Sequence, residues 1–173
     1  MKKWIVVTLF TGILILGGCS KKKEEAFQAN LKTLATESFD LAADSETAGI
    51  SYLDAWRTVI YDDIVLIDGQ TYTDFNDALY AQKILFETDG TNLAIEKQQT
   101  ELKNLFNEIK SNQIDKFSSE YETAKDFYLK SVEFSSFAIE PQGSYTSFSE
   151  GFSSRRDEIL SKYSSVKIEL GIE

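Results

Sequence analysis

The chain contains 173 residues, with 28 Asp and Glu against 18 Lys and Arg, so its formal net charge is −10. This length suits one domain, and the acidic balance argues against a nucleic-acid partner, because binding to a phosphate backbone needs a basic face. The absence of His excludes Ser-His-Asp and Cys-His catalysis and His-ligated metal sites, and a single Cys excludes an intrachain disulfide and Cys-rich metal sites. We therefore expect no catalytic residues, no metal site and no cofactor.

Residues 1–18 have the pattern of a bacterial secretory signal. Two Lys precede the apolar run 4–16, which is shorter than the roughly 20 apolar residues of a transmembrane helix. The tetrapeptide LGGC at 16–19 follows directly, and it resembles the lipobox of bacterial lipoproteins. An ordinary signal peptide with an incidental Cys is the competing interpretation, but the position of this only Cys directly after the apolar run favours the lipobox.

The lipobox resemblance implies a covalent diacylglycerol on the thiol of Cys19 and cleavage between Gly18 and Cys19, with a further acyl chain on the new amino group in some members. Two or three acyl chains anchor a protein stably, whereas one chain binds a membrane only marginally. The resemblance thus implies a protein held at the cell membrane by its lipid, on the extracytoplasmic face. Residues 19–26 would be the lipidated Cys and a polar tether, and residues 27–173 the helical domain.

A helical period begins at Phe27. Apolar or small residues recur there in alternating steps of four and three, at Phe27, Leu31, Leu34, Ser38, Leu41, Ser45, Ala48, Tyr52, Ala55 and Val59. This spacing places them in one seam along a helix face. We expect a break near Ala48-Gly49, with Ser51 and Asp54 starting a new helix.

The next stretch is richer in large apolar residues. A broad helix face would consist of Leu53, Trp56, Val59, Ile60, Ile64 and Ile67. It would end at Asp68-Gly69, where Gly can take the left-handed conformation that terminates a helix. A strand over 64–67 followed by an Asp-Gly hairpin turn is the competing structure. We favour the helix, because the period upstream is helical.

The rest of the chain predicts further helices joined by short turns. Helix starts, breaks and the clearest loop are expected at Thr73 or Asp74, Asp89-Gly90, Ser119 with Glu122, Pro141–Ser144, and Ser147 with Glu150. Two i,i+4 ion pairs are expected on exposed faces, Asp126 with Lys130 and Glu158 with Lys162. The predicted fold is all-α, an antiparallel bundle of about four to six helices on an N-terminal lipid-anchored tether.

Aromatic residues make up 13% of the chain, and most recur at helical spacing, as core residues do. Trp56 is the best single candidate for a buried anchor. A second aromatic group flanks the loop at Pro141, and it either closes one end of the bundle or forms a contact patch, for which Phe137, Tyr145 and Phe148 are the candidates. We favour closure of the bundle.

The sequence favours a non-enzymatic lipoprotein that acts through contact with an unknown surface protein or envelope component. A pattern of three parts resembles small lipoproteins of low-GC Gram-positive bacteria, a resemblance that implies no particular activity: Trp56 with Ile60, the triplet 74–76 with Ala78, and Pro141 with Gly143 and Ser144. The chain is also similar in size and anchoring to phage-encoded lipoproteins that block DNA entry by superinfecting phage. Two alternatives stay open: a ligand-binding lipoprotein, which a large cavity with convergent polar groups would favour, and a carboxylate-based envelope hydrolase.

Overall fold

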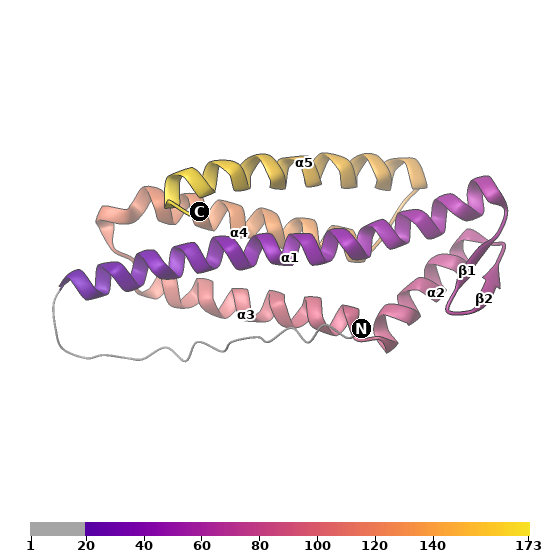
Figure 1. The fold of residues 1–173 in the computed structure, drawn as a ribbon, viewed down its shortest axis with the longest axis horizontal. Coiled ribbons are helices and arrows are strands. Elements are labelled where there is room, and N and C mark those ends of the chain that lie inside the picture. The colour runs from indigo at the N-terminus through magenta and orange to yellow at the C-terminus, as the bar shows by residue number, and fades with distance from the viewer. Residues whose placement is uncertain (1–19) are drawn as a thin grey trace.

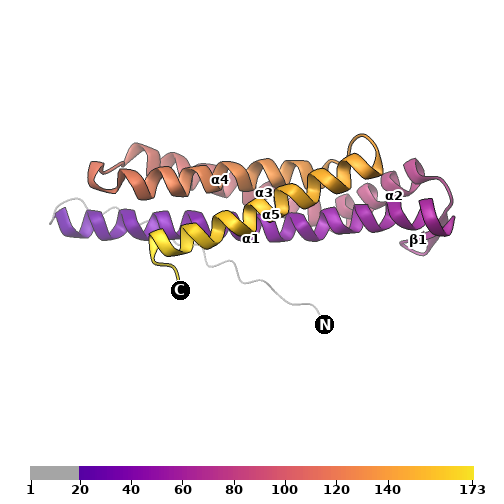
Figure 2. The same ribbon diagram turned by 90° about the horizontal axis from the view of Figure 1, so that it is seen from above.

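The computed structural model describes residues 20–173, which form an elongated helical bundle with one small hairpin (Figure 1). Its elements in chain order are α1 (Ser20–Asp62), β1 (Val65–Ile67), β2 (Gln70–Tyr72), α2 (Phe75–Thr88), α3 (Thr91–Ser111), the 3-10 helix η1 (Asp115–Phe117), α4 (Ser118–Ile139) and α5 (Tyr145–Leu170). The predicted helical bundle is confirmed, and α4 and α5 run alongside α1 (Figure 2). The predicted signal peptide and its Cys lie outside the described residues.

α1 is the axis of the bundle, because α2, α3, α4 and α5 all pack against it. Its 43 residues give it a length of about 64 Å at 1.5 Å per residue. All ten positions of the predicted seam are buried, so the helical period between Phe27 and Val59 is confirmed. The middle of this buried face carries small residues, namely Ser38, Ala42, Ser45, Ala48 and Gly49.

The expected break near Ala48-Gly49 is wrong, and the packing around Gly49 gives the reason. α1 continues through both residues, and Gly49 is buried against the ring of Phe152 on α5. A Cβ at position 49 would lie 2.3 Å from Cε2 of Phe152, closer than Cβ atoms come to other side chains. This glycine therefore makes room for a neighbouring helix and does not end its own.

One turn before Gly49, hydrogen bonds between buried and half-buried polar side chains join α1, α3 and α4. The hydroxyl oxygens of Ser45 on α1 and Ser135 on α4 lie 2.7 Å apart, and Nε2 of Gln99 on α3 donates to Ser135 at 2.9 Å. The Ser45 hydroxyl also lies 2.7 Å from the carbonyl oxygen of Leu41. Both hydroxyls thus have partners, which a buried polar group needs if it is not to cost stability.

The start of α1 differs from the expected polar tether. Residues 20–26 are helical and continuous with the rest of α1. Within this segment Glu24 pairs with Lys116 of η1, and hydrogen bonding by that ammonium lowers the pKa of the Glu24 carboxyl. Phe27 is the first buried side chain of the helix. The boundary at residue 27 therefore marks where the core begins, and the residues before it are the first turns of α1.

The segment after α1 is a hairpin, so the predicted helix over 64–67 is wrong and the competing strand is found. β1 and β2 pair antiparallel, with Val65 opposite Tyr72. Asp68 and Gly69 between them have φ angles of 46° and 74°. Two consecutive positive φ angles define the two-residue turn that Asp-Gly favours in a hairpin. The local turn residues therefore outweigh the helical period upstream.

The boundaries of α2 and the loop before α5 are as predicted. Asp74 caps α2, because its Oδ1 accepts hydrogen bonds from the backbone N–H of Asn76 at 2.8 Å and of Asp77 at 3.1 Å. Gly90, with φ of 87°, separates α2 from α3. The chain between α4 and α5 is the predicted loop at 141–144.

Both predicted capping boxes are wrong. α5 begins with a box between Ser144 and Ser147, one turn before the expected pair of Ser147 with Glu150. α4 begins directly after η1 without a side-chain cap, and Ser119 donates to Glu169 of α5 at 2.8 Å. Ser119 thus bonds to a neighbouring helix, whereas Ser147 is the last residue of a capping box that begins three residues earlier than expected.

Neither predicted i,i+4 ion pair forms, because the same four residues bridge two helices. Lys162 of α5 lies 2.5 Å from Asp126 of α4, and Lys130 of α4 lies 3.5 Å from Glu158 of α5. Exposed pairs of this kind contribute at most about 1 kcal/mol each. Their main effect is to align α5 along α4.

We expect Gly49→Ala to destabilise the bundle by about 1 kcal/mol, although Ala favours a helix over Gly by a similar amount, because overpacking a core costs about 1–3 kcal/mol. The new methyl group must displace the ring of Phe152, which is 2% exposed. Thermal unfolding followed by circular dichroism measures the change. Gly151→Ala is the matched control, since its Cβ would lie 3.0 Å from the half-buried Phe137 and should cost less. A melting temperature raised by Gly49→Ala would contradict this packing.

Candidate functional site

The predicted lipidation residue Cys19 and the cleavage site at Gly18 lie outside the described residues. The described chain begins at Ser20, which is already the first residue of α1. Three exposed Lys follow at 21–23, and each could gain about 1 kcal/mol beside an anionic leaflet. Between residues 20 and 173, no helix has the length and apolar character needed to cross a membrane.

The candidate contact residues Phe137, Tyr145 and Phe148 mainly close the end of the bundle. Phe148 is 1% exposed and packs against Phe137, with 4.9 Å between ring centroids, and against the buried Trp56 at 6.2 Å. Phe137 is half-buried beneath the guanidinium of Arg155. Of these three residues only Tyr145, which is half-buried, lies next to a strongly exposed aromatic ring, that of Tyr61.

A different apolar surface is exposed at the hairpin end of the bundle, and we call it the tip surface. The name covers five exposed apolar residues on or between the elements at this end, Ile60, Tyr61, Ile64, Leu66 and Phe75. Leu66 and Tyr61 are the most exposed of the five, at 70% and 68%. The sequence does not predict this surface: the expected helix face includes Ile60 and Ile64, but Ile60 is exposed within α1 and Ile64 lies after the end of that helix.

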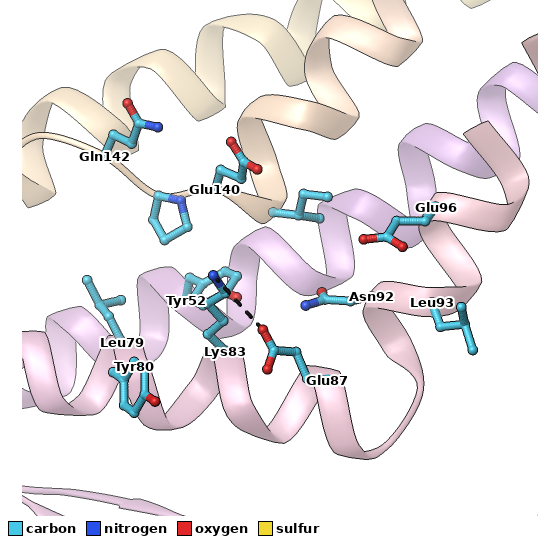
Figure 3. Close-up of a pocket in the computed structure, with 12 residues that line it drawn as sticks. Tyr52, Leu79, Tyr80, Lys83, Glu87, Asn92, Leu93, Glu96, Glu140 and Gln142 are labelled. Carbon is cyan, nitrogen blue, oxygen red and sulfur yellow. Dashed lines mark ion pairs between the residues drawn. The ribbon is translucent and has the colours of Figure 1, made fainter. Parts of the chain in front are cut away.

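A groove of about 600 Å³ lies in the same half of the molecule and is open to solvent on one side. It runs between α2, the start of α3 and the end of α4, with α1 behind it (Figure 3). Its lining residues are Tyr52, Leu79, Tyr80, Lys83, Glu87, Asn92, Leu93, Glu96, Ile139, Glu140, Pro141 and Gln142. Small-molecule sites commonly have volumes of about 300–1,000 Å³, so this groove has the size of a ligand site.

Tyr52 forms the inner wall of the groove. Its ring meets that of Phe86 edge-on, with 5.3 Å between centroids. The residue is 1% exposed, and its hydroxyl has no hydrogen-bond partner. Burial, followed by the charges of Glu87 and Glu140, raises the pKa of Tyr52 to about 12. The phenol is neutral near pH 7, and its buried hydroxyl keeps a donor and unused lone pairs beside the groove.

The charged lining of the groove is mostly acidic. Glu87, Glu96 and Glu140 contribute three carboxylates, and Lys83 contributes one ammonium. Lys83 lies 4.0 Å from Glu87, and because both side chains are about half-exposed this pair is weak. Asn92 adds a buried Oδ1 without a hydrogen-bond partner. The groove thus combines an excess of negative charge with two polar atoms that lack partners.

Sequence reasoning did not single out the groove, because its walls come from elements that are distant in the sequence. Tyr52 was assigned only to the core seam, and the residues around it belong to α2, α3, α4 and the following loop. The one available signal is that Tyr52 is the only seam position with a hydroxyl on an aromatic ring. In the part of the chain that the structure describes, no three Asp, Glu, Cys or His side chains are grouped as metal ligands would be.

No family model, curated protein or solved structure matches this chain. The tip surface and the groove are therefore interpreted from their own geometry.

Tyr52→Phe should leave the protein at least as stable as the wild type. It keeps the packed ring and removes a hydroxyl that has no partner, and since an unsatisfied buried group costs about 1–3 kcal/mol, we expect a gain of about 1 kcal/mol. Ser45→Ala is the matched control, because it removes a buried hydroxyl that is hydrogen-bonded and should lose about 1 kcal/mol. Denaturant unfolding measures both changes. A large loss for Tyr52→Phe would mean that its hydroxyl has a partner in solution.

Proposed function

We propose that the chain is a lipid-anchored extracytoplasmic protein that acts by non-covalent contact through its tip surface. The observation that carries this proposal is the position of that surface. It lies at the hairpin end of the bundle, whereas α1 begins at the opposite end with Ser20, next to the predicted lipid on Cys19 (Figure 1).

The length of α1 separates these two ends by about 64 Å along the helix. Ser20, which follows the predicted lipidation residue in the sequence, is already part of α1. The lipid supplies the membrane affinity, so the apolar side chains of the tip surface are free to contact another molecule.

The tip surface has the composition of a contact site. Exposed apolar side chains that gather at one end of a molecule mark interaction surfaces, and aromatic residues are enriched among those that contribute most to binding. The ring of Tyr61 meets that of Tyr145 edge-on at 6.3 Å, and the ring of Phe75 stacks on Trp56 at 6.3 Å. These inner rings support the exposed ones, so little ordering is needed when a partner binds.

The partner in this proposal is another surface protein or an envelope component, and the strong acidic balance makes nucleic acid a poor candidate. Phage superinfection exclusion is one role of this kind. Its support is the similarity of the chain, in size and anchoring, to phage-encoded lipoproteins with that activity.

Cys19→Ala in the full chain should abolish labelling by radioactive palmitate and remove the protein from the membrane fraction or leave it unprocessed, because the acyl chains are attached at this residue. Cell fractionation and labelling measure both effects. Ser20→Ala is the control, since it changes the neighbouring residue and keeps the thiol. Lipid labelling that survives Cys19→Ala would exclude the lipoprotein assignment.

A photo-crosslinking amino acid at position 66 should give a discrete adduct in intact native cells, because Leu66 is the most exposed apolar residue of the tip surface. Position 168 is the matched control, since Ile168 is 85% exposed but lies near the end of α5, away from the tip surface. Leu66→Glu should abolish the contact while changing stability by less than about 0.5 kcal/mol, as exposed substitutions usually do. Equal adducts from both positions, or none from position 66, would refute the proposal.

A further inference from the structure

The groove shares no residue with the tip surface. The proposed contact through the tip surface therefore leaves the groove without a role. Its lining carries three carboxylates and one ammonium, so a bound molecule would experience a negative field. The ammonium of Lys83 is directed to Glu87 at 4.0 Å, and within residues 20–173 Glu96 and Glu140 have no ion pair. The electrostatic environment therefore favours a cation and disfavours an anion.

Acidic side chains alone would form an ordinary solvated surface, and the Tyr52 hydroxyl distinguishes this groove from one. The residue is 1% exposed, and its hydroxyl oxygen has no partner in the described chain. Figure 3 shows its side chain directed from α1 into the space between Glu87 and Glu140. Buried polar groups are almost always hydrogen-bonded, so a molecule that reaches this hydroxyl from the groove would supply the missing partner.

The aliphatic side chains of the lining indicate which kind of cation would fit the groove. Its aliphatic members are Leu79, Leu93, Ile139 and Pro141. Methylene groups of a ligand gain from contact with such side chains, whereas a bare or hydrated metal ion does not. The groove therefore suits a cation that carries an aliphatic chain.

We propose that the groove binds a linear alkyl polyamine, a molecule in which ammonium groups are joined by short methylene chains. One ammonium lies near Tyr52 and donates hydrogen bonds to its hydroxyl oxygen and to the carboxylates of Glu87 and Glu140. The methylene chain lies against the aliphatic walls, and a second ammonium approaches Glu96. Two ammonium groups would neutralise the excess of two negative charges in the lining.

Titration calorimetry on the full chain in detergent, with spermidine as the probe, tests this proposal at about 0.15 M salt, where weak long-range attraction is screened. We expect saturable binding to one site. Glu140→Gln should weaken it about tenfold, since a hydrogen bond to a charged group contributes on the order of 1.4 kcal/mol or more. Tyr52→Phe should weaken it about fivefold while the melting temperature stays equal or rises, which separates loss of the hydroxyl from loss of the fold.

Glu150→Gln is the matched control, because Glu150 is exposed on α5 and lies outside the groove. It removes the same charge and should change affinity less than about twofold, as expected for a distant, screened charge. Spermidine acetylated on both primary amines should bind much more weakly. The proposal is overturned if no saturable binding occurs, if Tyr52→Phe and Glu140→Gln bind as the wild type does, or if Mg²⁺ at equal ionic strength displaces spermidine as effectively as a second polyamine.

Discussion

The bundle depends on the absence of a side chain at Gly49. The ring of Phe152 occupies the space that a Cβ would need, and it packs in turn on Phe134 at 5.3 Å and on Phe148 at 6.1 Å. This aromatic cluster closes the end of the bundle and supports Trp56, on which Phe75 of the tip surface is stacked. The position of the exposed aromatic ring thus traces back, contact by contact, to one glycine in the middle of α1.

The features that the sequence predicted well are those decided within a single helix. The seam of α1 recurs with the helical period, and all of its positions are buried. The role of Gly49 could not be predicted in this way, because its neighbour Phe152 lies about a hundred residues further along the chain. The hairpin is only the second choice from the sequence for the opposite reason: Asp68 and Gly69 define a very local turn, and the longer helical period upstream favours a helix.

The candidate sites were harder to predict than the fold. The groove needs walls from four helices, and nothing in the sequence shows that Glu140 and Glu87 lie near the same buried hydroxyl. The tip surface was equally hard to foresee, because Ile60 has helical spacing from the buried Trp56 and yet is exposed within α1. Charge pairing shows the same limit, since Lys130 and Lys162 pair with carboxylates on the neighbouring helix and not with the expected partners four residues away.

The continuity of α1 has a mechanical consequence if the chain is anchored at Cys19. A partner pulling at the tip surface and a lipid resisting at the other end would load α1 almost parallel to its own axis. The tension would then run through the backbone hydrogen bonds of α1, and the side chains of its buried seam, packed against four other helices, would oppose its extension. Under the proposed anchoring, this geometry would let the bundle keep hold of a partner while the attached lipid stays in the membrane.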